Sequence, residues 1–478
     1  MDAYTEYDAL GLAELISRKE VKPEEVLGAA VARAEKARTE LNCFSAVFPE
    51  IADEQLRSPP AHDGPFAGVP FATKDLAVEI AGAPLTNGSR GWRGNVCEQD
   101  SEITRRYRDA GLVLFAQTTS PEFGLTTSTE SALYGQTRNP WDLSRTSGGS
   151  SGGASAAVAS GVIPMAQASD GGGSIRIPAA CTGLFGMKPS RGRTPMGPRV
   201  TENWQGCSTV HAVSRTVRDN AALLDATHGR EPGARIAAFA PHGTFLSALE
   251  QDPEPLRIAL WEQAPNGTMP NPDAKAGLTA TADRLESVGH VVEAANPGLD
   301  GEALGKAFLM TISADLAETL RRREAALGRT LGESDLEPIT RQIASLGNAV
   351  PMVELASANR AFQEAAIQYE RWMHAGHFDI ALMPALSRAP DPLGRLSLSP
   401  SDPEDYNTAV TTFAPHCAVY NQIGCPAMSV PLHWTEAGLP IGMMFGARMG
   451  EERLLYQLAG QIERAFPWAD RKPNVFYA

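Results

Sequence analysis

The sequence has no excess of basic charge, no long apolar run and no paired cysteine motif. Its 42 Lys and Arg residues are outnumbered by 56 Asp and Glu residues, which argues against a nucleic-acid or anionic-membrane surface. No stretch approaches the ~18 apolar residues of a membrane helix. The start, Met1 to Tyr4, lacks the basic and apolar regions of a signal peptide. We therefore expect neither a nucleic-acid nor a membrane partner.

Cysteines are few and scattered, without a C-x-x-C pair. The six positions are Cys43, Cys97, Cys181, Cys207, Cys417 and Cys425. In a sequence without secretory context, such cysteines are typical of free thiols in a cytosolic protein, and some are expected to be buried as small apolar residues. The predicted compartment is the cytoplasm.

Helical and strand patterns alternate along the 478 residues. Helices are predicted at 8–41 (two, with Asp8 as N-cap and Pro23 in a first turn), 101–111, 272–288, 315–327, 354–373 and 451–465. Strands are predicted at 66–75, 112–116, 256–260, 290–293 and 379–384, with a proline-rich connection at 58–60. This alternation predicts an α/β fold, a single large domain with a central mixed β-sheet flanked by helices.

The composition shifts towards Gly, Ser and Ala between residues 144 and 190. Two glycine-rich turns that present Ser150 and Ser174 flank a helix predicted at 153–160 and a strand predicted at 162–168. Dense glycine is costly in chain entropy, and tight packing of a helix on a strand is one reason for it. The three glycines before Ser174 offer another, because successive bare N–H groups form a nest that can receive an oxyanion.

A serine hydroxyl is a weak nucleophile and needs a base within hydrogen-bonding reach. None of the nine histidines lies in a recognisable catalytic context, and most are expected on the surface or in turns. Lys74, among apolar neighbours, is the best candidate, because burial disfavours the ammonium form and lowers the pKa of a lysine. The alternative is a strand-end lysine that reaches solvent or pairs with Asp75.

Taken together, the motifs closely resemble the amidase signature family. They are Gly68-x-Pro70-x-x-x-Lys74-Asp75, Gly148-Gly149-Ser150-Ser151-Gly152-Gly153, Asp170-x-Gly172-Gly173-Ser174-Ile175-Arg176-x-Pro178 and Asn421-x-x-Gly424-x-Pro426-Ala427. The resemblance covers most of the chain and is weakest over 300–375. The glycine at position 171 looks most like the bacterial enzymes that open nylon cyclic dimers and some aryl acylamidases, and is expected to make room for a bulky acyl group.

This resemblance implies an amidase with a Ser–Ser–Lys triad that uses no metal and no cofactor. Ser174 would form the acyl-enzyme, Ser150, preceded by a cis peptide bond, would relay the proton, and neutral Lys74 would be the base. The oxyanion hole would comprise the N–H groups of Gly171, Gly172, Gly173 and Ser174. The supporting residues would be Ser151, Asp170 and Arg176.

The same resemblance divides the domain, 1–478, into N-terminal helices (1–60), a signature core (61–205) and the rest of the sheet with a variable pocket region (206–478). Substrate contacts are implied at Gly124, at Tyr420 and within 300–375. Leu309 and Met310 are expected in the core, and the alternative is that they line an apolar channel. The substrate would be a small-molecule amide, anilide or nylon-type cyclic or linear oligoamide, cleaved with water. A homodimer is the default expectation.

Three alternatives stay open. The same triad would also cleave a carbamate or an ester. An amidotransferase subunit would need a partner to deliver ammonia. An α/β-hydrolase would use Gly148-x-Ser150-x-Gly152 as a nucleophile elbow, although the segment before Ser150 is turn-like and not the apolar strand that an elbow requires.

Overall fold

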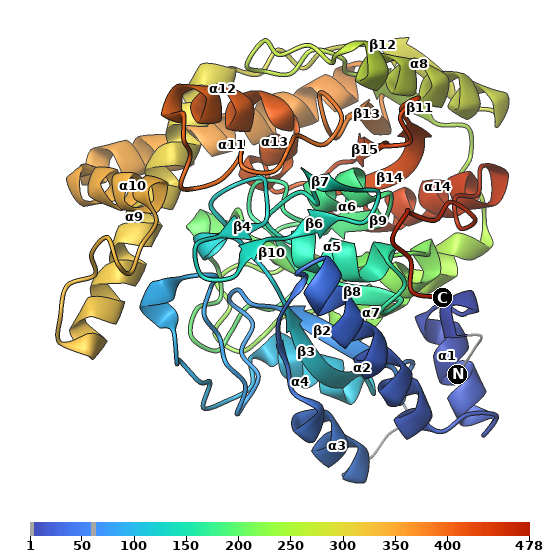
Figure 1. The fold of residues 1–478 in the computed structure, drawn as a ribbon. Coiled ribbons are helices and arrows are strands. Elements are labelled where there is room, and N and C mark those ends of the chain that lie inside the picture. Colours follow the sequence, from blue (N-terminus) through green and yellow to red (C-terminus); the bar gives the residue numbers. More distant parts are fainter. Residues whose placement is uncertain (1–3, 59–63) are drawn as a thin grey trace.

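An eight-stranded mixed sheet forms the centre of the molecule (Figure 1). The computed structural model describes residues 4–58 and 64–478. The strand order is β12 (Val291–Ala294), β11 (Arg257–Leu260), β13 (Ile380–Pro384), β15 (Pro440–Gly446), β14 (Ala427–Trp434), β9 (Phe185–Lys188), β10 (Thr209–Ser214) and β8 (Met165–Asp170). The pairs β11–β12 and β11–β13 are parallel and the others antiparallel, so the predicted mixed sheet is confirmed.

A second, three-stranded sheet extends the first beside β8. Its order is β1 (Phe44–Val47), β3 (Val113–Thr118) and β2 (Pro70–Lys74). The N–H of Lys74 donates to Oε1 of Gln167 in β8 at 2.6 Å, which places the end of β2 against the large sheet. Strand β1 lies in the N-terminal segment, where only helices were predicted.

Two short strand pairs complete the β structure: β4 (Glu130–Ser131) with β5 (Gly135–Gln136), and β6 (Arg138–Asn139) with β7 (Asp142–Thr146). The segment before Ser150, predicted as a turn, therefore contains the short polar strand β7. The expected connection at 58–60 and the first residues of the chain lie outside the described residues, apart from Ser58 and Tyr4.

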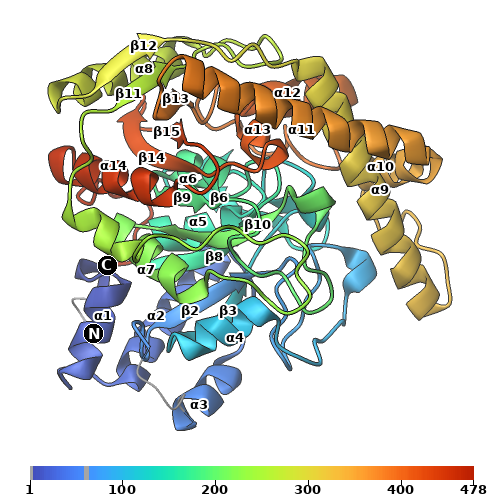
Figure 2. The ribbon, with the colours of Figure 1, turned by 180° about the vertical axis from the view of Figure 1, so that it is seen from behind.

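Helices cover both faces of the large sheet (Figures 1 and 2). A Cβ built on Gly442 of β15 would touch Ala180 of α6, whereas a Cβ built on Gly277 of α8 would touch the side chain of the next β15 residue, Met443. Because neighbouring side chains of a strand point to opposite faces, α6 and α8 lie on opposite sides. The helices are α1 (Ala9–Ser17), α2 (Pro23–Glu40), α3 (Pro49–Arg57), α4 (Glu102–Asp109), α5 (Gly152–Ala159), α6 (Arg176–Thr182), α7 (Val217–Thr227), α8 (Pro272–Ser287), α9 (Gly301–Leu327), α10 (Pro338–Ala349), α11 (Met352–Ala375), α12 (Pro403–Phe413), α13 (Cys417–Gln422) and α14 (Glu452–Ala465).

Local signals place several helix ends as predicted. Asp8 caps α1 by accepting from the N–H of Gly11, and Pro23 opens α2. Helix α9 begins earlier than predicted, because Asp300 caps it at the N–H of Ala303. It projects from the body of the molecule together with α10 (Figure 1).

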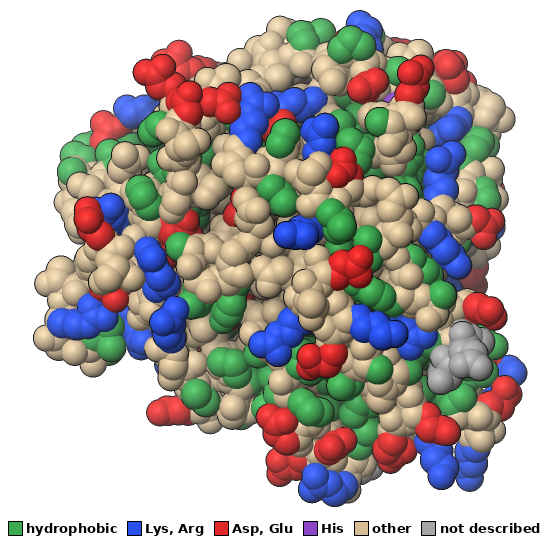
Figure 3. Space-filling view, in the orientation of Figure 1, with side chains coloured by type: hydrophobic (Ala, Val, Ile, Leu, Met, Phe, Trp, Pro, Cys, Tyr) green, Lys and Arg blue, Asp and Glu red, His purple; other side chains and the backbone are tan. Residues whose placement is uncertain are grey.

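The buried and exposed side chains partly follow the sequence-based expectations. All six cysteines are free and buried, as expected for small apolar residues. Three of the nine histidines, His211, His290 and His416, are buried, whereas most were expected on the surface or in turns. On the face shown in Figure 3, acidic and basic side chains are interspersed. Among the helices of residues 4–58 and 64–478, none is long and apolar enough to span a membrane.

Candidate active site

Lys74 ends β2 with its side chain fully buried. Its Nζ donates to Oγ of Ser150 at 2.7 Å and to Oγ of Ser169 at 3.0 Å. Asp75 does not take part, since its carboxylate accepts from the N–H and hydroxyl of Thr86. Burial lowers the pKa of Lys74 from 10.5 to about 7, against the opposing charge of Asp170. The lysine is therefore neither solvent-exposed nor paired with Asp75.

Ser150 and Ser151 lie in the turn that leads into α5. The peptide bond between Gly149 and Ser150 is cis, and Ser150 is 1% exposed. Ser151 Oγ donates to the carbonyl of Ser169 at 3.2 Å and accepts from the Ser169 N–H at 3.3 Å. Ser151 thus holds Ser169, the second partner of Lys74. The contact of Ser169 with Lys74 was not predicted, because only the adjacency of β2 and β8 creates it.

Ser174 lies in the loop between β8 and α6, which Asp170 holds in place. The Asp170 carboxylate accepts from Arg176 through two bonds of 2.9 Å, so the expected pairing is present in the fully buried interior. Asn421 adds bonds of 2.9 Å to the Asp170 carbonyl and to its Oδ1, a contact that was not predicted. Burial alone would raise the pKa of Asp170, but Arg176 and the hydrogen bonds lower it below its ordinary value.

The glycine run before Ser174 differs from the expected oxyanion nest in two ways. The N–H of Gly173 donates to Oδ1 of Asp170 at 2.7 Å and is therefore occupied. Within the described part of the chain, the N–H groups of Gly171, Gly172 and Ser174 have no hydrogen-bond partner. The room expected at Gly171 is filled, because a Cβ there would lie 2.6 Å from the ring of Trp204.

A cavity of about 850 Å³ opens at Ser174 and Gly124. A Cβ built at Gly124 would lie 3.0 Å from Ser150 Oγ, so this glycine of the cavity lining lies directly against Ser150. Helices α9 and α10 form one wall of the cavity, in the region 300–375 where the pocket was expected. Helices α12 and α13 form a second wall, which was not predicted. Leu309 lines the cavity and is 40% exposed, so its expected place in the core was wrong.

Tyr420 is located away from this cavity. Its side chain is fully buried, and its hydroxyl is 3.2 Å from the hydroxyl of Tyr369. A Cβ on Gly446 of β15 would lie 2.1 Å from the Tyr420 ring, which shows how closely the ring packs on the sheet. Tyr420, where a substrate contact was expected, therefore does not line this cavity.

Residues 25–456 of the chain match the amidase family. The chain belongs to the amidase signature family. Among its relatives, 6-aminohexanoate-cyclic-dimer hydrolases from Pseudomonas sp. (strain NK87) and from Paenarthrobacter ureafaciens are each 34% identical over 98% of this chain and 96% of their own length. This match excludes the α/β-hydrolase alternative, in which Ser150 would be the nucleophile.

Solved structures agree with this assignment. A 6-aminohexanoate cyclic dimer hydrolase complexed with substrate superposes with a TM-score of 0.94 at 32% identity and covers 100% of both chains. A bacterial aryl acylamidase of the same family superposes with a TM-score of 0.86 at 25% identity and covers 97% of both chains. This amidase is accordingly a hydrolase that acts on carbon–nitrogen amide bonds.

Proposed function

We propose that this amidase hydrolyses a small neutral amide through an acyl-enzyme on Ser174, with Ser150 as proton relay and Lys74 as base. The observation that carries the proposal is the 2.7 Å contact between Lys74 Nζ and Ser150 Oγ directly behind the cavity at which Ser174 lies. A lysine whose pKa is about 7 is largely neutral at slightly alkaline pH and can accept a proton.

The reaction begins with a proton transfer along this chain of groups. Lys74 takes the hydroxyl proton of Ser150, and Ser150 takes the hydroxyl proton of Ser174. At the same time, Oγ of Ser174 forms a bond to the amide carbon. The carbonyl oxygen gains negative charge and is stabilised by the unoccupied N–H groups of Gly171, Gly172 and Ser174, which replace the four-donor set of the prediction. The proton returns to the leaving nitrogen as the C–N bond breaks. Water then releases the acid by the same steps in reverse.

An uncharged acyl group fits the cavity best. Among the described residues, Glu302 is the one charged side chain of the lining, and the rest are apolar or neutral polar. The relatives' names support two substrate classes: a cyclic oligoamide, as in the cyclic-dimer hydrolases, and an anilide, as in the aryl acylamidase. A carbamate or an ester would react at the same serine. An amidotransferase role would instead require delivered ammonia in place of water.

A fluorophosphonate probe and a substrate panel test the proposal. We expect the probe to label Ser174, and Ser174→Ala to abolish labelling and to lower the hydrolysis rate by at least about 10⁴-fold. The exposed serine variant Ser287→Ala serves as a matched control with unchanged activity. The panel contains anilides, cyclic and linear oligoamides, carbamates and esters. Labelling that persists in Ser174→Ala would assign the nucleophile to another residue.

A further inference from the structure

Several polar side chains of the cavity are already bonded within the protein. Thr126 Oγ1 and Asn266 Nδ2, for example, each donate to a backbone carbonyl, at 2.8 and 3.0 Å. Two lining residues carry a buried polar atom without a partner among the described residues: Gln422, through Oε1, and Thr127, through Oγ1. A hydroxyl can turn towards other acceptors, whereas Oε1 can only accept a hydrogen bond.

Gln422 is the last residue of α13 and is 3% exposed. Its Nε2 makes one long bond, of 3.4 Å, to the carbonyl of Leu304. A buried acceptor without a partner is destabilising, and a ligand that donates to it removes that cost. The cavity lining therefore includes a buried hydrogen-bond acceptor that no group of the described residues satisfies.

Two helices place this amide one turn away from the Ser174 loop. On α13, Ala418 lies 4.0 Å from a Cβ built at Gly172, and Gln422 follows four residues later. On α9, Phe308 lies 3.0 Å from the same built Cβ, and Leu304, the partner of Gln422, precedes it by four residues. Residues four apart share a helix face and lie about 6 Å apart along the axis. A substrate group a few bonds from the scissile carbonyl can therefore reach Gln422.

The donor that fits here is neutral. Apart from the exposed Glu302, the described lining holds no charged side chain, so a substrate ammonium at Gln422 would lose its hydration without a counter-ion. A secondary amide offers an N–H to Oε1, and its carbonyl can accept from Nε2, whose internal bond is long. An ester or a plain hydrocarbon chain offers no donor.

We infer that Gln422 determines specificity by hydrogen-bonding a second amide group in the acyl part of the substrate, beyond the amide that is cleaved. The inference rests on the proposed function, because it places the scissile amide at Ser174. It selects oligoamides over simple anilides and esters as the substrate class.

Two anilides with acyl chains of equal length test this inference. One chain contains an internal secondary amide, and the other has two methylene groups in its place. We expect wild-type enzyme to prefer the amide-containing chain in kcat/KM. Gln422→Leu is expected to lower kcat/KM by about fivefold to tenfold on that chain and to change it little on the hydrocarbon chain. Gln363→Leu, at an exposed position of α11, is the matched control.

A third anilide, methylated on the internal amide nitrogen, tests the wild-type protein without any substitution. It lacks the N–H donor, so we expect the same fivefold to tenfold loss of kcat/KM. Equal losses of Gln422→Leu on both chains, or no loss on methylation, would overturn the inference while hydrolysis at Ser174 continues. Absence of hydrolysis of all three anilides together with absence of probe labelling would instead contradict the proposed function.

Discussion

Single residues determine the protonation state on which the proposed reaction depends. Lys74 is fully buried next to two serine hydroxyls, and burial lowers its pKa to about 7. The nearest carboxylate in sequence, Asp75, is bound by Thr86 and does not stabilise the ammonium form through a direct contact. A neutral amine at the end of β2 is the physical basis of the base that we propose.

The pH dependence of activity follows from this lysine. We expect kcat/KM to rise with pH and to reach half its maximum near pH 7, because only the neutral form accepts a proton. Lys74→Ala is expected to lower kcat/KM by about 10² to 10⁴-fold. The control is Lys188→Met: burial also lowers the pKa of Lys188 to about 7, but its Nζ donates to the Pro189 carbonyl. A Lys74→Ala variant with most of its activity and an unchanged pH profile would remove lysine from the mechanism.

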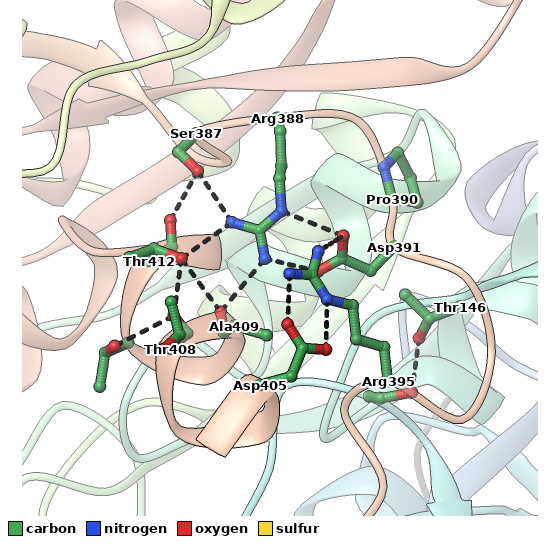
Figure 4. A network of polar contacts seen from close by, with 12 residues as sticks. Thr146, Ser387, Arg388, Pro390, Asp391, Arg395, Asp405, Thr408, Ala409 and Thr412 are labelled. Carbon is green, nitrogen blue, oxygen red and sulfur yellow. Dashed lines mark hydrogen bonds and ion pairs between the residues drawn. The ribbon is translucent and has the colours of Figure 1, made fainter. Parts of the chain in front are cut away.

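Among the helices that line the cavity, α12 is held in place by a network of polar contacts (Figure 4). Asp391 accepts from Arg388 and Arg395, and Arg395 also binds Asp405 of α12 at 2.9 and 3.0 Å. The carbonyl of Asp391 accepts from Thr146, the last residue of β7, at 3.0 Å. The network therefore ties α12 to the loop after β13 and to the strand before Ser150. Helix α12 supplies five residues of the cavity lining: Tyr406, Asn407, Val410, Thr411 and Thr412.

Two aspartate variants test how far this network positions α12. Asp391 is 4% exposed, so Asp391→Asn is expected to lower the free energy of unfolding by about 2 kcal/mol and to raise KM more than it lowers kcat. Asp405 is 45% exposed, and Asp405→Asn should cost less than about 1 kcal/mol. Denaturant unfolding and steady-state kinetics measure both effects. Equal effects of the two substitutions would mean that burial of Asp391 is unimportant.

The molecule as a whole has to accommodate the neutral lysine, and this affects its stability. The unfolded chain keeps the Lys74 proton up to pH 10.5, whereas the folded chain keeps it only up to about pH 7. Between these values the unfolded state binds more protons, so stability falls as the pH is lowered from 10.5 to 7, and the loss is complete below pH 7.

The expected homodimer remains a prediction, since a single chain is described.

Replacement of Lys74 by an apolar residue should remove this loss of folding stability at low pH. We expect Lys74→Met to be inactive but to have a Tm at least about 2 °C above that of the wild type at pH 6, with the difference shrinking towards pH 10. Differential scanning calorimetry across this range measures it. Ser174→Ala, the control, should show an offset that does not change with pH. A Lys74→Met variant that is destabilised equally at every pH would contradict the expected cost of burying this lysine.

The sequence by itself determined the family and the α/β class, and it predicted Lys74, Ser150 and Ser174 as site residues, because these depend on local motifs and on periodic apolar patterns. It also predicted the buried cysteines and the first helix caps. Such features are encoded within a few residues of one another, and no long-range contact is needed to recognise them.

Only the tertiary structure decided which distant groups meet. The adjacency of β2 and β8 brings Ser169 to Lys74, and the packing of α13 on the Ser174 loop brings Asn421 to Asp170. Tertiary packing also places Tyr420 in the core, and Trp204 fills the space at Gly171. Strand order and helix packing join segments far apart in the chain, and local propensity carries no information about such contacts.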